Sequence, residues 1–70
     1  MTTNHLSSDN RAWNMYRGHE YMTFIVNPDG LVVVARYHNT QNREEWGIDE
    51  AAGRQFTCVW TTYQAQGYAL

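Results

Sequence analysis

The four residues Asn27-Pro28-Asp29-Gly30 constrain the fold of this chain more than any other feature. They separate two runs, 21–26 and 31–38, that are rich in the β-branched and aromatic residues typical of strands. Proline presets φ for the second position of a type I turn, and glycine accepts the left-handed conformation that closes a three-residue loop. The sequence therefore predicts an antiparallel hairpin with strands 21–26 and 31–38.

The loop type also predicts the register of this hairpin. Ile25 is expected opposite Val33, and Glu20 opposite His38, where the two side chains would form a cross-strand ion pair. Both faces of the hairpin are apolar near the turn, so each face is expected to need a cover. The C-terminal segment is one cover, and the other is the N-terminal segment, a further strand or another molecule.

The C-terminal third predicts a helix over 49–66 that packs on the hairpin. Acidic residues occupy its first turn, where the helix dipole favours them, and apolar residues recur at helical spacing. Gly67, followed by apolar Tyr68, is typical of a helix C-terminus. The alternative is a third strand at 56–63, because that stretch has strand propensity and Gly53 weakens a helix. Residues 39–47 are expected to form a polar connection.

The N-terminal part is interpreted as a flexible tail, 1–7, that precedes a single α+β domain, 8–70. Ser8 and Asp9 are suitable caps for a short helix that places Trp13 on one face and ends at Gly18. The alternative is that these residues extend the following strand backwards. The expected fold is thus a small antiparallel sheet with a C-terminal helix and a short N-terminal helix.

Size makes the stability margin of this chain thin. A domain of 70 residues buries only about 60% of the surface that its unfolded chain exposes. Cys58 is the single cysteine, so no internal disulfide can form, and a dense core or oligomerisation must stabilise the fold. The N-terminus has no signal-peptide pattern, and the longest apolar run, 31–35, is too short to cross a bilayer. With a lone thiol, these features predict a cytoplasmic protein.

The charge pattern argues against binding to duplex nucleic acid. The net charge is −2, and the five basic side chains are all arginines scattered along the chain. Duplex binding needs clustered positive charge, because contacts to phosphates and the release of counterions supply most of the affinity.

No catalytic, cofactor or metal motif is present. His19-Glu20 lacks the second histidine that a zinc-binding helix needs four residues after the first, since that position is Thr23. Cys58 is expected to be a small buried hydrophobe, because nothing fixes a histidine such as His38 beside it to activate the thiol. We therefore expect no enzymatic activity, no cofactor and no metal.

The excess of aromatic residues suggests a binding role instead. Aromatic residues make up 14% of the chain, and tyrosine, tryptophan and arginine dominate binding hot spots. One segment places a tryptophan among four acids, and we predict that it contacts a partner protein with a basic surface through Glu44, Glu45, Trp46, Asp49 and Glu50. The leading hypothesis is a non-enzymatic interaction protein that binds stoichiometrically, for example an inhibitor or adaptor of bacterial or phage type, with a homodimer as one form.

A single-stranded nucleic-acid-binding module is the alternative function. Tyr21, Arg36 and Tyr37 would form a stacking surface on the sheet, on which successive bases could lie. The net negative charge and the lack of lysine weigh against this alternative.

Overall fold

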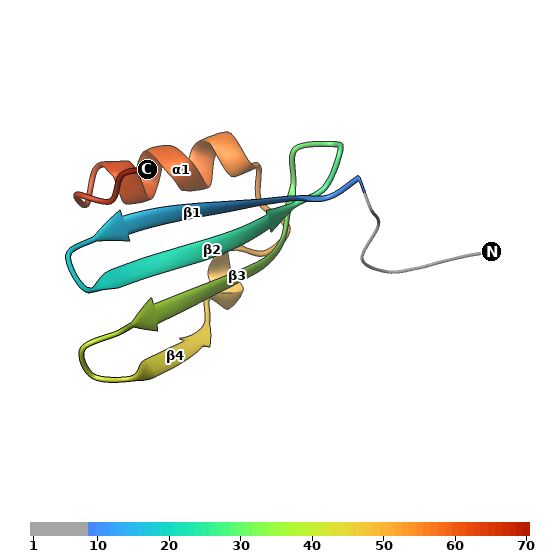
Figure 1. Ribbon diagram of the computed structural model, residues 1–70. Helices are drawn as coiled ribbons and strands as arrows, with labels where there is room; N and C mark the ends of the chain where they lie inside the picture. The colour runs from blue at the N-terminus through green and yellow to red at the C-terminus, as the bar shows by residue number, and fades with distance from the viewer. Residues whose placement is uncertain (1–8) are drawn as a thin grey trace.

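The computed structural model describes residues 9–70, which form one antiparallel sheet and one α-helix (Figure 1). The strands follow the chain in the order β1-β2-β3-β4. Their bounds are Arg11–Arg17 for β1, Glu20–Val26 for β2, Val32–Asn39 for β3 and Glu44–Gly47 for β4; the 3-10 helix η1 spans Asp49–Ala51, and α1 spans Phe56–Gln64. The predicted α+β class with a C-terminal helix is confirmed. The predicted tail, 1–7, lies outside the described residues.

The predicted N-terminal helix is wrong, because these residues form the edge strand β1. Gly18, with φ of 60°, takes the first position of a two-residue turn that folds β1 back on β2. Seven residue pairs then follow without interruption, so β1 gains a full ladder where an isolated helix of two turns would be marginal. The alternation of strand side chains buries Met15 completely and leaves Tyr16 exposed.

The hairpin of β2 and β3 forms around the turn that the sequence indicates. The Oδ1 atom of Asn27 accepts hydrogen bonds from the backbone N–H groups of Asp29 and Leu31, both at 3.0 Å. Gly30 has φ of 84°, a conformation that glycine adopts without a steric penalty.

Beyond this turn the register differs from the prediction. Val26 faces Val32 as expected, but Ile25 then faces Val34, because the extra residue Val33 forms a bulge. The shift reverses the faces of the rest of β3.

This reversal makes one face of the sheet more polar than predicted. Ala35 and Tyr37 now share the face covered by α1, whereas Arg36 and His38 move to the other face. An antiparallel sheet can leave such a mixed face in water. Among residues 9–70 no element lies over this second face, so the expectation that both faces require a cover is not met there.

The predicted polar connection at 39–47 is wrong over its last part, which forms the short strand β4 beside β3. The side chain of Asn39 builds the turn, since its Oδ1 accepts from the N–H groups of Gln41 and Asn42, both at 3.0 Å. Arg43 follows with φ of 57° and leads the chain into β4.

The C-terminal helix begins later than predicted, and the alternative of a third strand at 56–63 is wrong. Gly53, with φ of 84°, interrupts the helix that was expected from residue 49. Its N–H donates to the carbonyl oxygen of Val32 at 2.7 Å, which fixes this segment to the start of β3. The helix end matches its signal, because Gly67 has φ of 99° and the N–H of Tyr68 donates to the carbonyl oxygen of Tyr63 at 3.1 Å.

The core lies between the sheet and α1, toward β1 and β2 and away from β4 (Figure 1). Its largest fully buried side chains are Phe24, Met15, Met22 and Val32. After the helix, the chain returns to β1, where Tyr16 and Ala69 exchange two backbone hydrogen bonds of 2.6 and 2.9 Å. The outer edge of β1 is therefore partly paired by the C-terminal segment.

Candidate interaction surfaces

The acidic segment lies along the β4 edge of the sheet. Trp46 is half exposed, and its ring stacks on that of Tyr37, with centroids 4.4 Å apart. This stack holds the indole in a fixed orientation on the α1 side of the sheet. Asp49 and Glu50 follow in η1 and are exposed.

The two glutamates of β4 point in opposite directions. Glu44 shares the face of Trp46, whereas Glu45 lies on the uncovered face, since strand side chains alternate. The carboxylate of Glu45 accepts a hydrogen bond from Arg36 at 3.2 Å and lies 3.8 Å from the Nδ1 atom of His38. The structure thus brings the five predicted partner-binding residues to one edge but divides them between two faces.

The three residues predicted for nucleic-acid binding do not share a surface. Tyr21 and Arg36 lie on the uncovered face, but Tyr37 lies on the face of α1 because of the bulge. Tyr21 stacks on His38, with centroids 4.4 Å apart and planes 11° apart, and its other neighbour is Tyr16 at 5.7 Å. Neighbouring rings therefore occupy the flanks of Tyr21 that a base would need for stacking.

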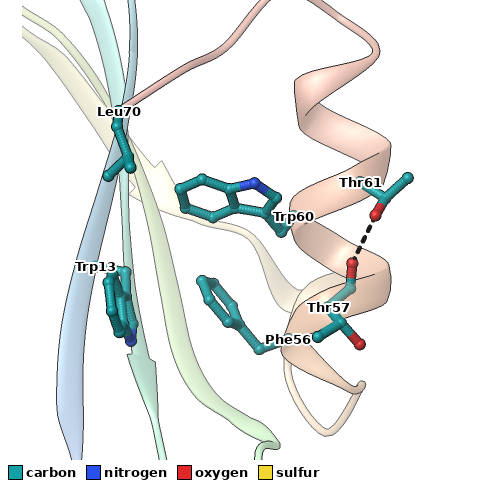
Figure 2. Close-up of a pocket in the computed structure, with 6 residues that line it drawn as sticks. All are labelled: Trp13, Phe56, Thr57, Trp60, Thr61 and Leu70. Carbon is teal, nitrogen blue, oxygen red and sulfur yellow. Dashed lines mark hydrogen bonds between the residues drawn. The ribbon is translucent and has the colours of Figure 1, made fainter.

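An apolar groove between β1 and α1 was not found from the sequence. Trp13 of the strand faces Phe56 and Trp60 of the helix, and Leu70 closes one end (Figure 2). The groove has a volume of about 350 Å³, and Trp13 is 43% exposed. The groove does not follow from the predicted N-terminal helix. A strand over residues 11–17 places Trp13 and Met15 on the same face of the sheet, toward the core.

A polar cluster of Arg17, Glu20 and Tyr68 fixes the C-terminal segment to the end of β1 that is farther from the groove. The hydroxyl of buried Tyr68 donates a hydrogen bond of 2.6 Å to Oε1 of Glu20, and Arg17 donates to the same oxygen at 2.5 Å. Arg17 also lies over the Tyr68 ring, 4.3 Å from its centroid. The predicted Glu20–His38 pair is therefore wrong, since Glu20 lies opposite Asn39 and its carboxylate contacts Arg17 and Tyr68.

These contacts shift two ionisation equilibria in opposite directions. The hydrogen bond from Tyr68, followed by that from Arg17, lowers the pKa of Glu20 below its ordinary value. Burial, together with the hydrogen bond to Glu20, raises the pKa of Tyr68 to about 12. Both shifts favour the state in which the carboxylate is ionised and the phenol is neutral.

Cys58 is exposed, so the prediction that it fills the core is wrong. The helix turns Phe56, Val59 and Tyr63 toward the sheet, and Cys58 lies on the side away from it. Within residues 9–70, no three His, Cys, Asp or Glu side chains are grouped so that they could hold a metal ion.

Comparison with protein-family models, with curated proteins and with solved structures gave no significant match. In the part of the chain that the structure describes, no helix has the length and apolar character needed to cross a membrane.

Proposed function

We propose that this protein acts without catalysis, by stoichiometric binding to another protein, as an inhibitor or adaptor. The observation that carries the proposal is the half-exposed Trp46, which is held by Tyr37 at an edge where Glu44, Asp49 and Glu50 are exposed. A large aromatic side chain that is already ordered loses little conformational entropy on binding, and such residues dominate hot spots.

The partner that fits this surface has a basic patch around a pocket for the indole. The exposed acids would steer the two proteins together. The indole of Trp46 would supply most of the affinity once it is buried in the pocket of the partner. The lone exposed thiol of Cys58 is compatible with a reducing compartment, so we place this interaction in the cytoplasm.

Single-stranded nucleic-acid binding has less support. Tyr21 is flanked by other rings, and Arg36 is paired with Glu45 on a face that carries no other arginine from β2 to β4. A negatively charged strand would therefore meet little free positive charge there.

The experiment begins with affinity purification from the native host, using the wild-type protein, Trp46→Ala and Tyr16→Ala as baits. Tyr16 is the matched control, because it is equally exposed but lies on the uncovered face. The captured protein is then identified, purified and titrated against each variant by calorimetry.

We expect the Trp46→Ala dissociation constant to rise by about 30-fold, as for a hot-spot residue, while Tyr16→Ala binds like the wild type. Wild-type affinity should also fall as salt is raised, because charge steers the encounter. The proposal is overturned if no protein binds stoichiometrically, or if Trp46→Ala binds as tightly as the wild type.

A further inference from the structure

We propose that the protein forms a symmetric homodimer by antiparallel pairing of two β1 strands across the groove that contains Trp13. This interface is on the edge of the sheet opposite to β4, so it does not depend on the proposed function.

β1 directs backbone N–H and C=O groups outward, away from β2. Tyr16 uses its outward N–H and C=O groups to bond Ala69. In an antiparallel strand, outward and inward residues alternate, so Asn14 and Ala12 also direct both backbone groups away from β2. Within residues 9–70, no backbone hydrogen bond outside the β1–β2 ladder reaches either of them.

The middle of this edge lacks the features that normally prevent strand pairing, since the charged residues Arg11 and Arg17 lie at the two ends of β1 and Ala69 covers the edge only at Tyr16. Edge strands are usually protected by lysine, proline, a bulge or a very short length. β1 has seven residues, contains no lysine or proline, and pairs with β2 without a bulge.

The apolar groove lies directly beside these outward backbone groups of β1. Trp13 projects from β1 toward α1, and its ring centroid lies 6.0 Å from that of Phe56 (Figure 2). The walls of the groove are mainly apolar, and Leu70 at its end is 81% exposed. An occupant that supplies a strand and a large apolar side chain would satisfy both features together.

A second copy of the chain is that occupant, because the edge is complementary to itself. When two β1 strands pair around a two-fold axis at Trp13, Ala12 of each copy faces Asn14 of the other. All four residues then exchange their outward N–H and C=O groups, and the small side chains of Ala12 and Asn14 meet on the uncovered face. The two Trp13 side chains meet on the side of α1, where each helps to fill the groove of the other copy.

Ala69 limits the length of the new ladder, because it already occupies the edge at Tyr16. The interface is therefore small, and we expect dimerisation at roughly micromolar concentrations and above.

The test is analytical ultracentrifugation of the wild type and of Asn14→Pro over about 1 µM to 1 mM, a range that spans the expected dissociation constant. Proline removes the outward N–H of Asn14 without breaking the β1–β2 ladder, and edge strands tolerate proline at such positions. We expect Asn14→Pro to weaken dimerisation by about tenfold or more. Glu45→Pro is the matched control on the other edge of the sheet and should dimerise like the wild type. The N–H of Ile48 donates to Ala35, so Ile48 directs its backbone groups toward β3, and by alternation Glu45 directs its own groups outward.

A second pair of variants keeps the test valid if proline disturbs the fold. Trp13→Glu and Trp13→Lys each place like charges at the two-fold axis, so each protein alone should be monomeric. An equimolar mixture should recover association, because opposite charges then face each other across the axis. Amide exchange at Ala12 and Asn14 should also slow as wild-type concentration rises. A wild type that stays monomeric to about 1 mM overturns the proposal, and so does a Trp13→Glu variant that dimerises like the wild type.

Discussion

The sheet has two edge strands, and β1 differs from β4 in nearly every property that controls pairing. β1 has seven residues and presents Trp13 beside an apolar groove. β4 has four residues, two of which are adjacent glutamates, and Asp49 follows closely. A second β4 strand would bring like charges together, which is one way in which natural sheets prevent edge pairing.

This difference suggests that the two edges have separate roles. Within residues 9–70, both strands have backbone groups that no other strand pairs, so the side chains decide what each edge can bind. The apolar β1 edge suits a second strand, whereas the acidic β4 edge would repel its own copy and, under the proposed function, would attract a basic surface. A dimer through β1 would present two β4 surfaces, one on each protomer.

The largest difference between the edges should appear in the aromatic residues that stabilise them. Tyr68 is buried against β1 and β2, so Tyr68→Ala should lower the free energy of unfolding by about 3 kcal/mol, as for other large-to-small core changes. Trp46→Ala removes only a half-exposed stack on Tyr37 and should cost about 1 kcal/mol. Urea unfolding followed by circular dichroism measures both, and similar losses for the two variants would contradict this ranking.

The elements that could be predicted from the sequence are those whose signals are local. The turn is formed by hydrogen bonds among residues 27–31, and the helix end is closed by the bond from Tyr68 to Tyr63. In both places the residue types that select the conformation lie within a few positions of the atoms that they bond.

The elements that were missed depend on contacts between distant residues. The helix starts at Phe56 because Gly53 bonds to Val32, a contact that no local pattern near Gly53 reveals. The bulge at Val33 lies outside the turn residues 27–30 and changes the partner of every later residue of β3. The groove is lined by Trp13 of β1 and by Phe56 and Trp60 of α1, which are far apart in the sequence. It can be predicted only when residues 11–17 are assigned as a strand, because that assignment places Trp13 on the face toward α1.

A smaller effect should distinguish two glycines, one near each edge. Gly67 has φ of 99°, and a Cβ atom there would lie 3.3 Å from Cδ of Arg17. Gly67→Ala should therefore cost about 1 to 2 kcal/mol, because alanine is strained in this conformation. A Cβ atom at Gly47 in β4 would meet no atom closer than 3.6 Å, so Gly47→Ala should change stability by less than about 0.5 kcal/mol.

Amide exchange adds a local measurement to the comparison of these glycines. Gly67 directs the chain toward β1, so its substitution should accelerate exchange at Tyr16 and Ala69, which bond each other. Gly47→Ala should leave both rates unchanged. Unchanged rates in Gly67→Ala would show that the C-terminal segment holds its position on β1 without this glycine.

The smallest expected effect is a pH dependence on the β1 side of the sheet, where Glu20 and Tyr68 ionise. The pKa of Glu20 is lowered in the folded protein, so the ionised carboxylate favours folding. This contribution is present above the ordinary glutamate pKa of about 4.3 and is lost as the pH falls through the lowered folded value. The raised pKa of Tyr68 acts at the other extreme: its contribution is present below the ordinary tyrosine pKa of about 10 and is lost as the pH rises through about 12.

Tyr68→Phe keeps the buried ring but removes the hydrogen bond that lowers the pKa of Glu20 most. We expect the pKa of Glu20, followed by NMR titration of its carboxyl carbon, to move back toward its ordinary value. The loss of stability on acidification should then be smaller than in the wild type, and the part of the alkaline loss that comes from Tyr68 should disappear. The part that comes from Tyr63, whose pKa burial also raises, should remain. Glu45→Gln at the β4 edge should leave the titration of Glu20 unchanged, because Glu45 bonds Arg36 and contacts none of the groups around Glu20. If the pKa of Glu20 stays low in Tyr68→Phe, then Arg17 and Tyr37 maintain it without Tyr68, and the C-terminal segment adds nothing to the electrostatics of the β1 side.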